Sequence, residues 1–205
     1  MDFFLVPNDP QKTVLVSANG VAHYQISTSK GTDGIHLSLI QRPADSEADS
    51  IVAEVEWGTW GTPTFVRCPL FRGFGSCIGK MGLGVTARTF LYKRRPFSKS
   101  RYFMGNDGVE YRWKARRGIG CVLTSSNNNE EIAIYTSTFN NEGLFAGERK
   151  HFLRIQPCSV DLDLVVLSFM IMEKKRRERA GDGSSLIAHD SDPQGDGAGD
   201  GGGEG

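Results

Sequence analysis

Basic and aromatic side chains are interleaved in the middle of the chain, and this is the stretch most able to bind a charged partner. Residues 67–117 carry thirteen basic and two acidic side chains, although the whole chain has no formal net charge. Nine of these basic residues form the candidate site: Lys93, Arg94, Arg95, Lys99, Arg101, Arg112, Lys114, Arg116 and Arg117. Such a concentration of positive charge indicates an anionic partner, which could be phospholipid head groups, nucleic acid or the acidic end of the same chain.

Six aromatic residues lie among these cations: Tyr92, Phe97, Tyr102, Phe103, Tyr111 and Trp113. Arginine beside exposed aromatics can stack on nucleic acid bases, or hold phosphorylated head groups while the aromatics enter a membrane interface. The alternative is that the aromatics face the core and the cations only solvate the outer face. Over residues 109–114 the alternation favours this alternative, because Tyr111 and Trp113 fall opposite Arg112. Both interpretations stay open.

The glycine-rich stretch 72–85 has the composition of a phosphate-binding loop but not its spacing. A P-loop needs a glycine where this chain has Phe74, and a hydroxyl residue where it has Met81. A dinucleotide fingerprint fails at Ile78, where the third glycine should stand. We expect bulges or tight turns here instead of a nucleotide site.

No other motif indicates catalysis or metal binding. The histidines, His23, His36, His151 and His189, lack metal-ligand spacing, and no GxSxG motif occurs. We therefore predict a protein that is not an enzyme, with no catalytic residues, no metal and no cofactor. The four cysteines, Cys68, Cys77, Cys121 and Cys158, have no CxxC spacing and are expected to be buried and reduced. Together with a start that is too short and acidic for a signal peptide, they indicate a cytoplasmic protein.

Residues 157–181 give the clearest structural signal. The run 162–172 is apolar on every face of a helix, which is typical of a buried helix, and it is far shorter than the about 20 residues that span a bilayer. Ser159 or Asp161 can cap its start, and Gly181 can follow its end. The basic block 174–179 (KKRRER) resembles a nuclear-localisation patch, but we expect it to complement the helix C-terminus. We predict a helix over about 160–179, with a buried strand as the alternative.

Most of the preceding chain has the alternation and turn residues of short β-strands. Strands are predicted at 13–17, 22–28, 35–41, 51–57, 63–67, 86–92, 100–104, 109–114, 119–124, 131–138 and 151–156. Residues 44–50 form an acidic loop. So many short strands indicate a barrel or a sandwich. Residues 1–180 are expected to form one domain, followed by a disordered acidic tail over 181–205, which holds nine glycines and six acids.

Several phrases together resemble a known family over roughly residues 10–180. They are YQIST at 24–28, VAEVEW at 52–57, RTF at 88–90, GVEYRWK at 108–114, LDLVV at 162–166 and MEKKRR at 172–177. This pattern is similar to the domain of unknown function 6593, a family of mushroom-forming fungi (basidiomycetes). The resemblance implies a likeness to tubby-like domains and to the LURP-one-related proteins. It implies a mainly β fold, a closed antiparallel β-barrel of about twelve strands around a central apolar C-terminal α-helix.

The same resemblance implies a function only loosely. Tubby domains bind phosphoinositides through basic surface residues, but those residues do not match this chain position by position, so the nine basic positions above rest on electrostatics alone. We predict a non-enzymatic domain that binds anionic phospholipid or phosphoinositide peripherally at a membrane. The alternatives are a nucleic-acid-binding or nuclear regulatory protein, a protein-interaction module using the same basic stretch, and an enzyme with its site at a barrel mouth.

Overall fold

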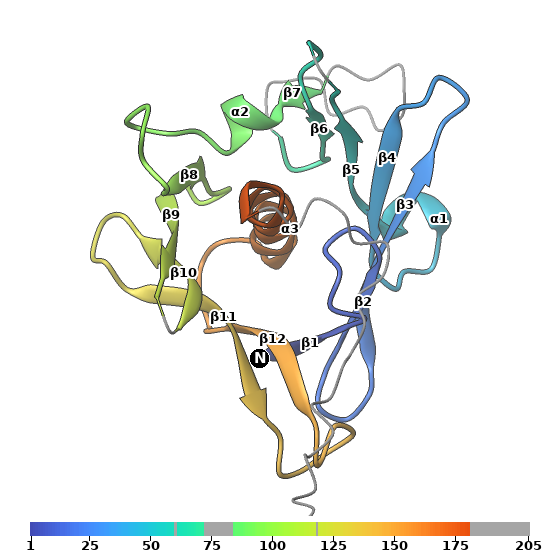
Figure 1. Cartoon of the computed structure of the whole chain (residues 1–205), viewed down its shortest axis with the longest axis vertical. Helices are drawn as coiled ribbons and strands as arrows, with labels where there is room; N and C mark the ends of the chain where they lie inside the picture. The colour runs from blue at the N-terminus through green and yellow to red at the C-terminus, as the bar shows by residue number, and fades with distance from the viewer. Residues whose placement is uncertain (60, 72–83, 118, 181–205) are drawn as a thin grey trace, which may run out of the picture.

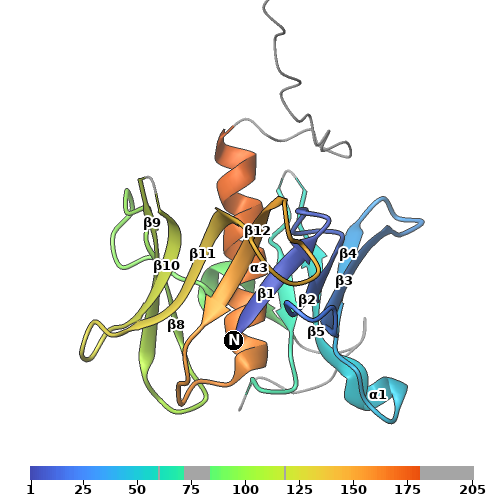
Figure 2. The same cartoon turned by 90° about the horizontal axis from the view of Figure 1, so that it is seen from below.

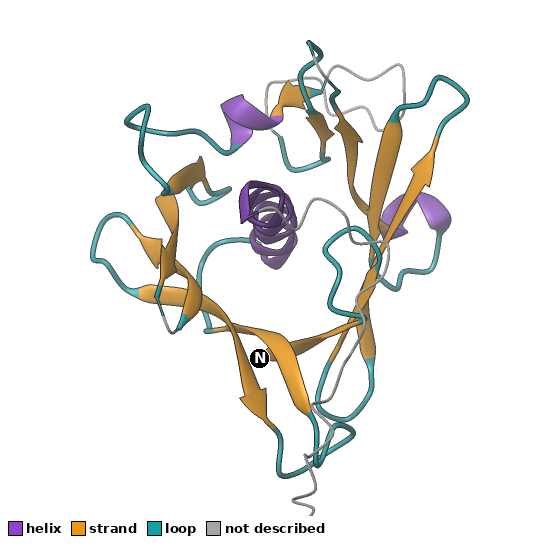
Figure 3. Ribbon diagram, in the orientation of Figure 1, coloured by secondary structure: helices purple, strands orange, loops and turns teal. Residues whose placement is uncertain are grey.

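The computed structural model describes residues 1–59, 61–71, 84–117 and 119–180. Within them, twelve strands form one antiparallel sheet that wraps around a single long helix (Figures 1 and 3). The strands are β1 (Asp2–Val6), β2 (Thr13–Val16), β3 (Ala22–Lys30), β4 (His36–Gln41), β5 (Ile51–Trp57), β6 (Phe65–Arg67), β7 (Val85–Thr86), β8 (Arg101–Met104), β9 (Glu110–Arg116), β10 (Gly120–Ser125), β11 (Glu131–Phe139) and β12 (Arg149–Ile155). The helices are α1 (Glu47–Ser50), α2 (Ala87–Phe90) and α3 (Leu162–Ala180).

The strand order runs β7-β6-β5-β4-β3-β2-β1-β12-β11-β10-β9-β8. The first and last strands therefore lie side by side in the middle of the sheet, with Phe3 opposite Leu153. The two edges of the sheet, β7 and β8, come from the middle of the chain. Figure 1 shows these edges on either side of α2, beside the long helix.

The predicted closed barrel is wrong, because no ladder joins β7 to β8 in the described part of the chain. The segment between these strands does not extend the sheet. It forms the single turn α2, which contacts β6, β7 and β8, and the Thr86 hydroxyl caps this turn by accepting from the Thr89 N–H at 3.1 Å. Tyr92 then makes an isolated bridge to Tyr102, which occupies the free edge of β8. The sheet is thus open, with a seam between β7 and β8.

The helix α3 fills the space inside the wrapped sheet, as Figures 1 and 2 show from two directions. Every residue from Leu164 to Met172 is at most 9 % exposed, so the prediction of a buried apolar helix is confirmed. Asp161 begins it, because its side chain accepts from the Asp163 N–H at 2.9 Å. Ser168, the one hydroxyl residue in the apolar run, accepts from the Trp113 indole N–H at 2.9 Å. Gly181 lies outside the described residues.

Most predicted strands are confirmed, with a few differences at specific places. The strand predicted at 86–92 is wrong beyond Thr86, where α2 begins. Strand β1 was not predicted, and the expected loop 44–50 contains the short helix α1, which Ser46 caps. Cys68 and Cys121 are buried as predicted, whereas Cys158 is exposed. Cys77, the segment 72–83 and the acidic tail 181–205 lie outside the described residues.

The C-terminal turns of α3 are anchored by carboxylates. Glu173 is fully buried and accepts from Arg176 at 2.7 Å and from Arg177 at 2.9 Å. Arg177 also donates to the Asn8 carbonyl at 2.8 Å, which ties the helix to the loop after β1. Lys174 is ion-paired with Glu178 one turn along. The block 174–179 thus stabilises the helix end, but it leaves two of its cations outside these ion pairs.

Candidate anion-binding site

The nine basic residues predicted from the sequence do not share one surface. Arg101 on β8 points inward and is 7 % exposed, with its guanidinium donating to the Ser98 and Ser100 carbonyls at 3.3 and 3.2 Å. On β9, by contrast, Tyr111 and Trp113 are buried in the core. The intervening side chains, Arg112, Lys114 and Arg116, therefore lie on the outer face of the sheet. Arg117 follows β9 and is exposed.

Some of these cations are already engaged within the protein. Arg94 is ion-paired with Glu110 and lies 4.8 Å from the centre of the Tyr102 ring. Burial alone would raise the pKa of Glu110, but hydrogen bonding from Tyr92 and the Arg94 charge hold it below its ordinary value. Tyr92 and Tyr102 stack on each other with centroids 6.0 Å apart. The faces of these two rings that contact each other are therefore not available for stacking with nucleic acid bases. On the outer face, Arg112 donates to the Thr124 hydroxyl at 3.3 Å, and Arg116 lies 4.0 Å from Glu131.

The loop 93–99 presents the remaining cations to solvent together with an aromatic side chain. Lys93, Arg95 and Lys99 are exposed, and no ion pair joins them to a carboxylate within the described residues. Phe97 lies between them and is 98 % exposed. The Lys93 ammonium donates to the Pro96 carbonyl at 2.8 Å, which closes the loop locally. We call residues 93–99 the basic loop.

A second group of cations gathers where the end of α3 passes β8 and the segment after α2. We call it the cation cluster, and its members are Arg88, Lys93, Arg101, Lys175 and Arg179. Lys175 and Arg179 are one helical turn apart, so they project from the same side of α3. Arg101 approaches them from the inner face of β8, while Arg88 and Lys93 come from α2 and the basic loop. Residues 88–101 and the end of α3, which are distant in the sequence, thus converge.

The positive charges of the cation cluster also lower one another's pKa values. Desolvation and then the positive charges of Arg101, Arg179 and Arg88 lower the pKa of the exposed Lys93 ammonium. Burial and then Arg179 lower the pKa of Arg101. Burial, followed by the Arg101 charge, lowers the pKa of Lys175, although Glu178 opposes this shift.

Within the described residues no carboxylate forms an ion pair with any member of the cation cluster. Like charges held together are destabilising, and a charge removed from water needs a counter-charge or strong hydrogen bonds. An anion with several oxygens, such as a phosphate, would supply the missing counter-charge. The cluster is therefore suited chemically to bind such a group.

Sequence reasoning found Lys93 and Arg101 but missed Arg88, Lys175 and Arg179 as site residues. The last two belong to the block that was assigned to the helix end alone. A helical projection would have placed Lys175 and Arg179, four residues apart, on one side of the helix. It would also have placed Arg176 and Arg177, three and four residues after Glu173, as the partners of that carboxylate.

Comparison with known proteins places the chain in a family. Residues 8–178 match the sequence profile described as "Family of unknown function (DUF6593)". The chain belongs to DUF6593. The family resemblance read from the sequence is thereby confirmed for DUF6593, while its fungal origin and the likeness to tubby-like domains stay predictions. Searches of curated proteins and of solved structures gave no match.

Two further findings concern the described part of this DUF6593 protein. Among the helices in the described ranges, none is long and apolar enough to cross a membrane. In the same ranges, no three histidine, cysteine, aspartate or glutamate side chains are grouped so that they could hold a metal ion. The cation cluster and the basic loop have a chemical preference for anions.

Proposed function

We propose that the protein binds anionic membrane surfaces peripherally, with the basic loop and the cation cluster in contact with lipid head groups. The observation that carries this proposal is Phe97, an aromatic side chain that is 98 % exposed between cations that form no ion pair in the described part of the chain. Segments that lie in a membrane interface combine basic residues, which attract anionic lipid, with aromatic side chains that enter the acyl boundary.

The expected affinity is modest and sensitive to salt. A lysine or arginine beside an anionic surface contributes about 1 kcal/mol, a figure we apply to Arg95 and Lys99. Burying a phenylalanine side chain contributes about 1.5–3 kcal/mol, which applies to Phe97. These contributions suffice for reversible recruitment, and the ionic part weakens as salt screens it.

The same proposal includes a cytoplasmic, non-enzymatic module that prefers phosphate-rich lipids such as phosphoinositides. The predicted relation to tubby-like domains, whose basic surfaces bind phosphoinositides, supports this preference without requiring a closed barrel. Nucleic acid is the alternative partner for the same cations. Bases need exposed aromatic faces; the mutual stacking of Tyr92 and Tyr102 occupies two of the candidate rings, which leaves Phe97 as the exposed one in the basic loop.

Liposome co-sedimentation of the full chain tests the proposal. We expect binding to phosphatidylserine and phosphoinositide vesicles, little binding to neutral vesicles, and weaker binding at physiological than at low salt. Phe97→Ser should reduce the bound fraction severalfold without loss of stability, because the side chain has almost no contacts to lose. Phe139→Ser is the matched control, since Phe139 on β11 is 55 % exposed and lies outside the basic loop.

Two results would contradict the proposal. One is no sedimentation with any anionic vesicle at low salt. The other is equal binding by Phe97→Ser and the unchanged protein. If single-stranded nucleic acid bound more tightly than vesicles, and Phe97→Ser left that binding unaltered, the nucleic-acid alternative would replace it.

A further inference from the structure

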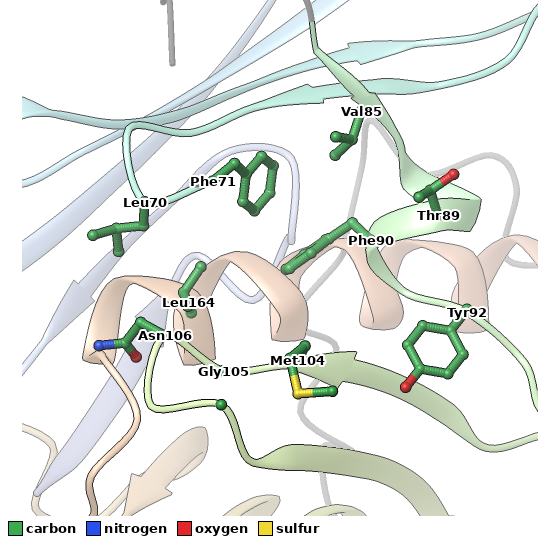
Figure 4. Close-up of a pocket in the computed structure, with 11 residues that line it drawn as sticks. Leu70, Phe71, Val85, Thr89, Phe90, Tyr92, Met104, Gly105, Asn106 and Leu164 are labelled. Atoms are coloured by element: carbon green, nitrogen blue, oxygen red, sulfur yellow. The ribbon is translucent and has the colours of Figure 1, made fainter. Parts of the chain in front are cut away.

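An apolar cavity lies at the open seam of the sheet, beside α3 (Figure 4). Its volume is about 350 Å³, within the range of about 300–1,000 Å³ that is typical of small-molecule sites. The side chains that form most of its wall are apolar or aromatic: Leu70, Phe71, Phe90, Met104, Leu164 and Tyr92. A site of this kind favours a hydrocarbon over a polar ligand.

The cavity follows from the open architecture. Within the described residues, no strand joins β7 to β8; the turn α2 lies between them, and Leu164 of α3 lines the cavity there. Phe90 forms one wall, with its ring 5.0 Å from that of Phe71 and 5.8 Å from that of Phe103. Met104 stands at the rim and is 53 % exposed. The cavity is therefore open to a ligand from outside.

One end of the cavity adjoins the cation cluster. Figure 4 shows Thr89 and Tyr92 at one end of the cavity, with Leu164 and Asn106 at the other. Thr89 and Tyr92 are the chain neighbours of Arg88 and Lys93, respectively, which belong to the cluster. The backbone of Tyr92 is also hydrogen-bonded to the backbone of Tyr102, the residue after Arg101. An apolar cavity thus leads toward a group of cations that form no ion pair within the described residues.

We propose that this cavity holds the hydrocarbon chain of a single-chain lipid whose phosphate head group lies on the cation cluster. The inference rests on the proposed function in one respect, since it uses the same cations, and it specifies the class of lipid. A single chain is indicated because the volume is at the small end of the range for ligand sites. The head group would supply a counter-charge to Arg101, Lys175 and Arg179, which form no ion pair within the described residues.

Calorimetric titration with inorganic phosphate and with alkyl phosphates of increasing length tests this assignment. All ligands are kept below the concentrations at which they aggregate. Each methylene buried in an apolar site should tighten binding about fourfold, until the cavity is full and the affinity reaches a plateau. Inorganic phosphate should bind weakly, by the head-group contacts alone.

Two variants separate the chain from the head group. Met104→Trp narrows the rim and should abolish the dependence on chain length while leaving the affinity for inorganic phosphate unchanged. Phe139→Trp is its control and should behave as the unchanged protein does. Arg179→Gln should weaken every ligand in the series by the same factor, because it acts on the head group only.

The outcomes distinguish this inference from the proposed function. Equal affinities for all chain lengths would overturn the cavity assignment even if vesicles bind, and so would a chain-length dependence that Met104→Trp does not alter. A dependence that Met104→Trp removes would support the assignment, even if vesicles fail to bind and the membrane proposal falls. Absence of binding to both phosphate compounds and anionic vesicles would overturn both.

Discussion

Arg177 and Arg179 lie two residues apart near the end of α3, and the same substitution to glutamine should shift the stability in opposite directions. Arg177 bonds the fully buried Glu173 at 2.9 Å and donates to the Asn8 side-chain oxygen at 2.7 Å. Arg179 makes no ion pair with a carboxylate within the described residues and faces the positive charge of Arg101. One arginine therefore neutralises a buried charge, and the other adds to a repulsive group.

The magnitudes follow from these contacts. Breaking a buried ion pair by removing one partner costs about 3–5 kcal/mol. Glu173 retains Arg176 at 2.7 Å, so Arg177→Gln should lower the free energy of unfolding by less than this, about 2 kcal/mol. A like-charge neighbour one helical turn away costs about 0.2–0.5 kcal/mol, and Lys175 is such a neighbour of Arg179. Arg179→Gln should therefore raise the free energy of unfolding by about 0.5 kcal/mol.

Urea unfolding followed by tryptophan fluorescence measures both changes as shifts of the midpoint at constant slope. Repeating the measurement with added phosphate tests the cause. A bound anion stabilises the folded state by linkage, so phosphate should stabilise the unchanged protein more than Arg179→Gln. If Arg179→Gln is as destabilising as Arg177→Gln, the cation cluster is not under repulsion. No anion would then be needed to relieve repulsion at that place.

Three further predictions concern other parts of the chain. Deleting residues 181–205, with their six acids, should tighten binding to anionic vesicles at low salt; equal affinities in co-sedimentation would exclude masking by the tail. The hydrogen bond from Arg154 lowers the pKa of Asp2 below 3.8, so this pair stabilises the fold above that pH and the contribution is lost on acidification. Urea midpoints should therefore show Asp2→Asn destabilising by no more than about 1 kcal/mol at neutral pH, with the difference shrinking below pH 3.8. Gly120→Ala should lower the thermal midpoint through a loss of about 2–3 kcal/mol, because the new Cβ would lie 1.9 Å from the Tyr135 carbonyl oxygen and φ is +121°.

The helix α3 could be predicted because its sequence leaves few alternatives. An apolar run with acids at its start and cations at its end has to be buried in protein when it is too short for a membrane. The outer and inner faces of β9 could also be predicted, since Tyr111 and Trp113 alternate with charged residues. In both cases a local pattern decides the structure.

Closure of the sheet could not be predicted, because it depends on contacts between distant segments. Residues 86–92 contain β-branched and aromatic side chains that suit a strand, yet Thr86 caps a helical turn and Phe90 packs on Phe103. Strand β1 could not be predicted from its local sequence either. Its identity as a strand depends on β12, which pairs with it from the other end of the chain.

The candidate site could be predicted only in part, because it too depends on contacts between distant segments. Counting charges located Lys93 and Arg101, but it could not show which cations are free. That depends on the positions of the carboxylates: Glu110 forms an ion pair with Arg94, and Glu173 forms ion pairs with Arg176 and Arg177. For the cations between residues 88 and 101, only the folded structure shows which ones form no ion pair within the described residues.

The central pairing of β1 with β12 makes the protein a candidate for assembly from two fragments. Strands β1 to β7 are neighbours in chain order, and so are β8 to β12. Each half can form its own hairpins before it meets the other, and the Met1 ammonium reaches the Ile155 carbonyl at 2.7 Å across a separation of 154 residues. A chain cut within the basic loop would leave both halves intact, with α3 carried by the second. We expect such a pair to reassemble along the β1–β12 ladder and around α3, which would give a split-protein reporter whose restored junction is the basic loop.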